Sequence, residues 1–222
     1  MDKITKPAIT EIPTLSELAK NYVQWGQEFS EFLKKGGKSS TFKFDRKIGL
    51  YNEMRNQLCL ITKEHCSFCD GHPIGKESKE TIEHYYPKSE FPLKSYDWDN
   101  LFYCCDKCQS EANKKIPFQE TLKPDNASYQ FSDYFYFDLG SGELKILENL
   151  ETENPQAFKQ ANAFLIRYGI SNNPKRKSAR ISLYKDIQNH FTAKSLTDDN
   201  RLRDDFSYRY VYDFYVKLNG IE

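Results

Sequence analysis

The sequence predicts an α+β fold in which a short zinc-clamped unit of strand, loop, strand and helix lies inside a mainly helical chain. Three observations support this prediction. Apolar residues recur at helical spacing on both sides of the middle of the chain, two Cys-x-x-Cys pairs bracket that middle, and a stretch of alternating aromatic residues with a Gly-Ser-Gly turn follows it. A chain of 222 residues is long enough to bury a core around such a unit.

The first predicted helix starts near Thr14 and ends at Gly36 and Gly37. Thr14 and Glu17 have the spacing of a capping box. An apolar stripe then recurs at steps of three and four residues, consisting of Leu15, Leu18, Tyr22, Trp25, Phe29 and Phe32. We interpret the stripe as a core face, and a docking face for another protein is the alternative.

The remaining elements follow in order along the chain. A second helix is expected over residues 46–61, and residues 134–147 predict a β-hairpin with its turn at 140–142. Asn154 followed by Pro155 indicates the start of a helix that runs to residue 168, and another helix is expected over 175–191. The aromatic tail, residues 204–220, fits a strand by its period and a helix by its length, so both remain open.

Composition excludes several classes of protein. Thirty-two basic and 32 acidic residues balance, which disfavours a strongly basic fold that coats nucleic acid. No apolar run approaches the roughly 20 residues that span a bilayer, and the N-terminus has no signal-peptide core. We therefore expect a cytosolic protein with no membrane partner. In a reducing cytosol, cysteines are expected to be metal ligands or buried thiols rather than disulfides.

The two cysteine pairs, Cys66 with Cys69 and Cys105 with Cys108, have the format of a four-thiolate zinc site. A redox-active pair is the alternative, and the absence of a surrounding βαβ pattern disfavours it. Three neighbours could replace one of these ligands, although each is more simply structural: Cys104, His65 and His72. Cys59 is expected to be a core thiol on the second helix.

The segment between and after the pairs carries the elements EH at residues 83–84, NLFYC at 100–104, CDKC at 105–108 and NKK at 113–115. In this order they resemble the HNH endonucleases, whose ββα-metal motif often lies inside a four-cysteine zinc clamp. The arrangement looks closest to HNH proteins of the PtuB type, which belong to Septu and retron anti-phage operons. The first 60 residues carry no such signature.

Phosphodiester hydrolysis needs a base for the attacking water and positive charge against the phosphate. His84 suits the base, since a neutral imidazole titrates near physiological pH. Glu83 and a helix amide would hold Mg²⁺ or Mn²⁺. The resemblance favours Asn113 as that amide, with Gln109 as the alternative, and it implies that Asn100 pins the loop between the strands and so directs His84.

Several lysines are candidates for phosphate contacts, namely Lys88, Lys114 and Lys115. Residues 173–180, NPKRKSAR, form a further candidate patch or a solvated helix start. We expect three parts: a helical extension over 1–61, the zinc-bound nuclease core over 62–118, and a hairpin with helices over 119–222.

The resemblance also implies substrates and partners. DNA is the default substrate, with RNA such as tRNA as the alternative. The expected partner is an ABC/SMC-like ATPase of the PtuA type and, in retron systems, a reverse transcriptase with its msDNA. The helical flanks would offer the docking surface, through the first helix or the aromatic tail. The competing hypothesis is a non-catalytic zinc-knuckle adaptor that binds protein or nucleic acid.

Overall fold

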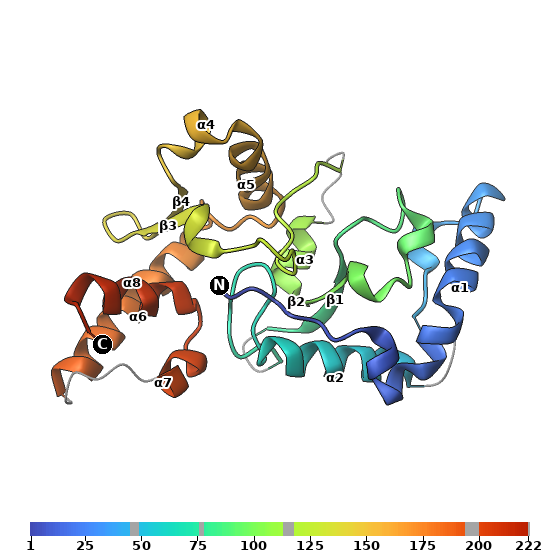
Figure 1. Ribbon diagram of the computed structural model, residues 1–222, viewed down its shortest axis with the longest axis horizontal. Helices are drawn as coiled ribbons and strands as arrows, with labels where there is room; N and C mark the ends of the chain where they lie inside the picture. The colour runs from blue at the N-terminus through green and yellow to red at the C-terminus, as the bar shows by residue number, and fades with distance from the viewer. Residues whose placement is uncertain (45–48, 76–77, 113–117, 194–199, 222) are drawn as a thin grey trace.

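The computed structural model describes residues 1–44, 49–75, 78–112, 118–193 and 200–221. Two separate two-stranded antiparallel sheets lie among helices, which confirms the predicted α+β class. Strands β1 (Glu80–His84) and β2 (Leu101–Cys105) and helix α3 (Asp106–Ala112) lie near the middle of the molecule (Figure 1). The N-terminal helices flank this unit to the right and below in that view, and the C-terminal helices lie to its left.

Helix α1 (Ser16–Lys34) begins later than its sequence pattern indicates. A single 3-10 turn, Pro13–Leu15, takes up Thr14, and Leu15 becomes the N-cap without a side-chain hydrogen bond. The predicted capping box of Thr14 and Glu17 is therefore wrong. Pro13 is the physical reason, because its fixed φ starts the helical backbone before Thr14 can act as a cap.

The apolar stripe of α1 faces the core, as the sequence indicates. Leu18 and Phe29 are buried. Trp25 packs edge-on against Tyr96, with ring centroids 5.5 Å apart. Among the aromatic residues of the stripe, Phe32 is exposed at 44%, and Tyr22 and Trp25 are half-buried. The stripe therefore serves mainly as a core face, and docking of another protein there stays a prediction.

Helix α2 (Leu50–Thr62) supports the strands from below in Figure 1. Its predicted first residues, 46–48, lie outside the described part of the chain. Gly49 precedes the helix with a φ of 86°, a left-handed conformation that suits glycine. Leu50, Met54 and Leu58 recur at helical spacing and are buried.

The strands β1 and β2 pair so that Glu83 lies opposite Phe102 and His84 opposite Leu101. All five residues of β2 are buried, and α3 follows directly after it. The expected order of strand, loop, strand and helix is therefore present. Two short 3-10 turns, Pro92–Lys94 and Trp98–Asn100, shape the loop that connects the strands.

The loop between the strands packs unusually close to α1. A Cβ atom built on Gly26 would lie 2.5 Å from the carbonyl oxygen of Leu93, which belongs to the first of the two turns. Real side chains cannot occupy that space. Gly26 therefore lets the turn approach the helix backbone, although glycine weakens a helix interior by about 1 kcal/mol.

The predicted hairpin and the helix after it are confirmed. Strands β3 (Phe135–Asp138) and β4 (Glu143–Ile146) pair around the expected turn. A short helix α4 (Leu150–Glu153) follows. The side chain of Asn154 then accepts a hydrogen bond from the backbone N–H of Ala157 and caps α5 (Pro155–Arg167).

The C-terminal part consists of helices α6 (Pro174–Ala193), α7 (Asn200–Asp205) and α8 (Arg209–Asn219). The aromatic tail, which the sequence left open between strand and helix, forms α8. Tyr210, Tyr212 and Tyr215 are buried in the core, whereas Phe206, Tyr208 and Phe214 are half-buried. A docking role for the tail stays a prediction. Among the described residues, no helix has the length and apolar character that crossing a bilayer requires.

Candidate functional site

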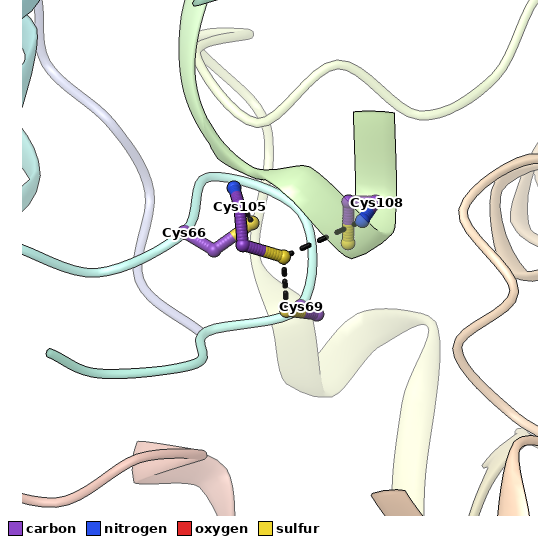
Figure 2. Close-up of side chains that lie close together, drawn as sticks. All are labelled: Cys66, Cys69, Cys105 and Cys108. Carbon is purple, nitrogen blue, oxygen red and sulfur yellow. Dashed lines mark hydrogen bonds between the residues drawn. The ribbon is translucent and has the colours of Figure 1, made fainter. Parts of the chain in front are cut away.

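Four cysteines meet at the base of the strand–strand–helix unit, and we call them the cysteine centre. Cys66 and Cys69 come from the loop after α2, Cys105 is the last residue of β2, and Cys108 lies on the first turn of α3 (Figure 2). All four are buried, and their sulfur atoms lie within 4.8 Å of one another. The grouping expected from the sequence is therefore confirmed.

The spacing of the sulfurs fits a tetrahedral ion. The Sγ atoms of Cys69 and Cys105 are 3.8 Å apart. Zinc–sulfur bonds of about 2.3 Å in a tetrahedron place neighbouring sulfurs about 3.8 Å apart. That distance is far longer than a disulfide bond of about 2.05 Å. The backbone N–H groups of Cys105 and Cys108 donate to the sulfurs of Cys66 and Cys105, each at 3.4 Å, as backbone groups do around a thiolate.

The pKa values of two of these thiols are shifted in opposite directions by their surroundings. Hydrogen bonds from Cys105 and Cys108 lower the pKa of Cys69. Burial raises the pKa of Cys108, and the other cysteines raise it further. Four thiolates so close together would repel one another. A dication at their centre would offset this repulsion, because each thiolate would then face positive charge. Four buried thiols with this spacing are a donor set suited to Zn²⁺.

The alternative ligands are occupied elsewhere. The thiol of Cys104 donates to the carbonyl of Cys105 at 3.2 Å. The rings of His65 and His72 stack on each other with centroids 4.4 Å apart, and their nitrogens reach backbone carbonyls of α7. Cys59 is half-buried on α2. The interpretation of these residues as structural is consistent with all of these contacts.

Glu83 and His84 end β1 and line one cavity of about 600 Å³, which we call the β1 cavity. Lys88 from the following loop and Gln109 from α3 line the same cavity. Aromatic residues of the segment after α1 close one side of it, namely Phe42 and Phe44, together with Tyr51. An acid, an imidazole, an amide and an ammonium group thus share a single recess beside the cysteine centre's helix.

The imidazole of His84 is fixed in orientation and tautomer. Its Nε2 atom lies 2.8 Å from the carbonyl oxygen of Ser95. Since a carbonyl only accepts, Nε2 carries the hydrogen and Nδ1 keeps its lone pair. Phe44 stacks on the ring at 5.2 Å and Phe42 meets it edge-on at 5.5 Å, so that only 5% of the residue is exposed.

These surroundings change the titration of His84. Burial, and to a smaller extent the charge of Lys88, lower the pKa of His84 to about 3. The expectation that His84 titrates near physiological pH is therefore wrong for this arrangement. The ring is neutral throughout that range because the protein has replaced its water shell with phenylalanine rings.

Glu83 is shifted in the opposite sense. Burial raises the pKa of Glu83 to about 7, although Arg167, Lys88 and Gln109 each oppose the rise. Arg167 ends α5, and its Nη2 atom lies 3.9 Å from the carboxylate of Glu83 and 3.3 Å from the carbonyl oxygen of His84. A further positive charge beside the carboxyl group would therefore lower its pKa and favour the ionised carboxylate.

Asn100 makes the contacts expected of a residue that pins the loop. Its side-chain oxygen accepts a hydrogen bond from the backbone N–H of Tyr86 at 2.6 Å. Its amide nitrogen donates to the carbonyls of Tyr86 and Lys94, at 3.0 and 2.8 Å. Asn100 does not line the β1 cavity, and its connection to His84 runs through the loop whose Ser95 carbonyl contacts the imidazole.

The helix residues expected to complete a second metal site are only partly described. Gln109 donates its amide N–H to the carbonyl of Ile82 at 3.0 Å, so its nitrogen faces β1. The amide would have to turn before its oxygen could hold a cation beside Glu83. Asn113, Lys114 and Lys115 lie outside the described residues.

Most of the basic side chains of segment 173–180 are buried or paired within the protein, and Lys175 is the exposed one. Arg176 and Arg180 are 5% and 0% exposed. Lys177 is tied to Glu143 at 2.7 Å. Arg176 instead reaches the sulfur of Cys108. The sequence pattern was misleading because it does not show whether an arginine at the start of a helix faces the core or the solvent.

Sequence reasoning missed two arginines, Arg167 at the β1 cavity and Arg176 at the cysteine centre. A signal was present, since Arg167 interrupts the apolar run FLIRYG at the end of a helix. An arginine in such a place is often buried against a partner.

Comparisons with known proteins add no identification. A scan against models of known protein families gives no match. A search of curated proteins finds no sequence of significant similarity. The function must therefore be argued from the residues and their arrangement.

Proposed function

We propose that this chain is a metal-dependent HNH endonuclease that hydrolyses phosphodiester bonds of nucleic acid. One observation carries the proposal. The strand–strand–helix unit held at the cysteine centre brings Glu83 and His84 from β1 and Gln109 from α3 to one cavity. That combination of an acid, a base and a helix amide beside a four-cysteine clamp is the one that the sequence resemblance implies.

In this proposal His84 accepts the proton of the attacking water at Nδ1. Its Nε2–H stays on the carbonyl of Ser95, which stops the ring from rotating and keeps Nδ1 as the acceptor. An anionic phosphate entering beside the ring favours the imidazolium, and so raises the pKa of His84 from its low value in the cavity without substrate. The base therefore gains strength when substrate arrives.

Glu83 would hold the catalytic cation together with a helix amide, from Asn113 or from a turned Gln109. Mg²⁺ or Mn²⁺ bound there supplies Lewis acidity for the phosphate. The raised pKa of Glu83 suits this role, since a cation at the carboxylate favours the ionised form and burial disfavours water as a competing ligand. Lys88, which lines the cavity, would contact a phosphate oxygen.

The biological setting is proposed on the resemblance alone. DNA is the default substrate and RNA such as tRNA the alternative, because the motif contacts phosphate and sugar rather than base edges. The chain would be the effector subunit of an anti-phage complex in the bacterial cytoplasm, with an ABC/SMC-like ATPase of the PtuA type as partner. In a retron system, a reverse transcriptase and its msDNA would join it.

One observation favours the second candidate, a non-catalytic zinc-knuckle adaptor. His84 is 5% exposed beneath Phe42 and Phe44, and its pKa of about 3 makes it a weak base while it stays covered. A nuclease must uncover this ring when it binds substrate, whereas an adaptor need not. The two hypotheses differ in whether Mg²⁺ or Mn²⁺ ever promotes cleavage.

The test is a cleavage assay on the protein, alone and with its partner ATPase, using plasmid DNA and total tRNA in parallel. Wild type is expected to cut one of them only when Mg²⁺ or Mn²⁺ is present. His84→Ala is expected to cut at least ~100-fold more slowly, as for loss of a general base, while it retains zinc.

His190→Ala is the matched control, because His190 lies on α6 and does not line the β1 cavity. Full activity in His84→Ala would refute the assigned role of the imidazole. Absence of divalent-dependent cutting by wild type under all of these conditions would favour the adaptor.

A further inference from the structure

The cysteine centre has a cationic neighbour from the far end of the chain. Arg176 lies on the first turn of α6 and is 5% exposed. Its Nη2 atom donates to the sulfur of Cys108 at 3.1 Å and lies 4.0 Å from that of Cys105. Nη1 donates to the carbonyls of Tyr168 and Gly169, at 2.8 and 3.0 Å, which fixes the plane of the guanidinium.

The other buried arginines of this part of the chain are held differently. Arg209 is paired with the carboxylate of Asp70, with Nη2 and Oδ1 2.5 Å apart. Arg180, one helical turn after Arg176, donates to the hydroxyl of Tyr210 and to two carbonyls. In place of a carboxylate, the Nη2 atom of Arg176 faces the sulfurs of Cys108 and Cys105. The counter-charge of Arg176 is therefore sulfur.

The charge of a filled centre explains the need for such a residue. Zn²⁺ with four thiolates carries two net negative charges, and a buried dianion is costly unless a cation lies beside it. A guanidinium N–H on a thiolate also removes electron density from the sulfur. It thereby slows protonation of that sulfur, which is the step by which a thiolate leaves zinc.

We propose that Arg176 is a positioning residue of the metal centre, which retains zinc by neutralising and hydrogen-bonding the thiolate of Cys108. This inference rests on the proposed zinc centre and not on nuclease activity. It therefore makes no demand on the β1 cavity, and its test measures the metal itself.

The first test measures metal release. Zinc is loaded into wild type, Arg176→Gln and Arg176→Lys, and its transfer to a chromogenic chelator is followed at a temperature where every variant is folded. Arg176→Gln is expected to lose zinc about 10–100-fold faster, as for other residues that support a metal ligand. Arg176→Lys keeps the charge and is expected to lie between the two.

Two controls separate this role from general effects. Lys175→Gln removes an exposed charge from the same helix turn and should release zinc at the wild-type rate. Arg180→Gln removes a buried guanidinium that contacts no cysteine, so it should lower the melting temperature without altering the metal's spectrum. Release from Arg176→Gln no faster than from Arg180→Gln would overturn the proposal.

A spectroscopic readout reports on the sulfur directly. With Co²⁺ in place of zinc, loss of the N–H donor raises the energy of the sulfur electrons, so the sulfur-to-cobalt charge-transfer band should move to lower energy in Arg176→Gln. It should not move in Arg180→Gln. An identical band in wild type and Arg176→Gln would refute the hydrogen bond to the thiolate.

A measurement on wild type keeps the inference testable if Arg176→Gln does not fold. In ¹⁵N-labelled protein loaded with ¹¹³Cd²⁺, an arginine Nη–H proton should show coupling to the metal through the N–H···S bond. Absence of that coupling in a metal-loaded protein would overturn the proposal. Wild type that binds neither zinc nor cadmium would remove the centre on which it rests.

Discussion

Glu83 and His84 are neighbours in sequence whose burial has opposite consequences. Burial disfavours the charged form of each, so it raises the pKa of the carboxyl group and lowers that of the imidazole. Near pH 7, with no ion bound in the β1 cavity, the imidazole is therefore neutral and the carboxyl group is only about half ionised. Binding of a cation and an anion together would restore the charge on both, which links occupancy of one position to occupancy of the other.

The raised pKa of Glu83 predicts how the free energy of unfolding changes with pH in buffer without Mg²⁺ or Mn²⁺. Its folded pKa of about 7 lies above the ordinary value of 4.5, so its contribution to stability is present below pH 4.5 and is lost as pH rises through 7. Glu83→Gln removes this loss. The variant is expected to be more stable than wild type at pH 8, by on the order of 3 kcal/mol, and to converge with it towards pH 5.

Denaturant unfolding at several pH values checks this prediction. Glu120→Gln serves as the control, because Glu120 is exposed and its substitution should leave the pH profile unchanged. A difference between Glu83→Gln and wild type that stays constant from pH 5 to pH 8 would contradict the burial argument.

For single residues, the sequence predicted which side chains form the candidate site better than it predicted the neighbours that surround them. The four cysteines follow from the short-range spacing of the two Cys-x-x-Cys pairs, and the role of Asn100 was expected from the family resemblance. The phenylalanine cover on His84 and the two arginines come from segments 40 or more residues away in the sequence, and no local pattern records such contacts. The titration of His84 was misjudged for this reason.

Among the elements, α1 and the turn Pro92–Lys94 form the contact that positions the loop of the candidate site. The residue after this turn, Ser95, holds His84 through its carbonyl. Gly26 lets the turn approach the helix backbone, so the helix supports the loop that carries the Ser95 carbonyl.

Gly26→Ala tests this contact. The added methyl group would lie 2.5 Å from the Leu93 carbonyl, a backbone atom that cannot rotate away. The clash is expected to outweigh the gain of about 1 kcal/mol in helix propensity and to destabilise the protein by about 1–3 kcal/mol.

Thermal melting measures the cost, and the same preparation reports whether cleavage also falls. Gln24→Ala, at an exposed position of the same helix, is expected to stay within about 0.5 kcal/mol of wild type. A Gly26→Ala protein as stable as wild type would show that the turn moves freely.

Helices and the hairpin were predictable because their periods and caps are local. The secondary structure of the tail was not predictable, because its alternating aromatic residues also fit a strand. In the fold the tail is a helix that buries Tyr210, Val211 and Tyr215. The start of α1 was predicted wrongly because Pro13 begins a 3-10 turn that includes Thr14, which therefore cannot be the N-cap.

For the whole molecule, the cysteine centre joins distant parts of the chain. The ring of Phe68, between Cys66 and Cys69, stacks on Tyr168 with centroids 3.9 Å apart. The carboxylate of Asp70, directly after the knuckle, accepts hydrogen bonds from Arg209 at the start of α8. Loss of the metal would therefore loosen the C-terminal helices as well as the strands.

Removal of zinc should accordingly lower the melting temperature of the whole protein and weaken its near-ultraviolet circular dichroism, because stacked aromatic rings separate. Cys69→Ser is expected to bind less than one zinc per chain and to melt early even with added metal. Cys59→Ser, which changes a cysteine outside the centre, should keep full zinc content. Zinc content and melting temperature are measured for each protein. An unchanged melting temperature after zinc removal would show that the C-terminal helices do not depend on the metal.

The end of α5 has a consequence for how the chain can be divided. Arg167 points to Glu83 and His84, while the carbonyls of the next two residues, Tyr168 and Gly169, are held by Arg176 beside the sulfurs. A fragment cut to residues 62–118 would keep the four cysteines, Glu83 and His84 and still lose both arginines. We therefore expect a fragment to need the chain through the first turn of α6 before it matches the stability of the whole protein.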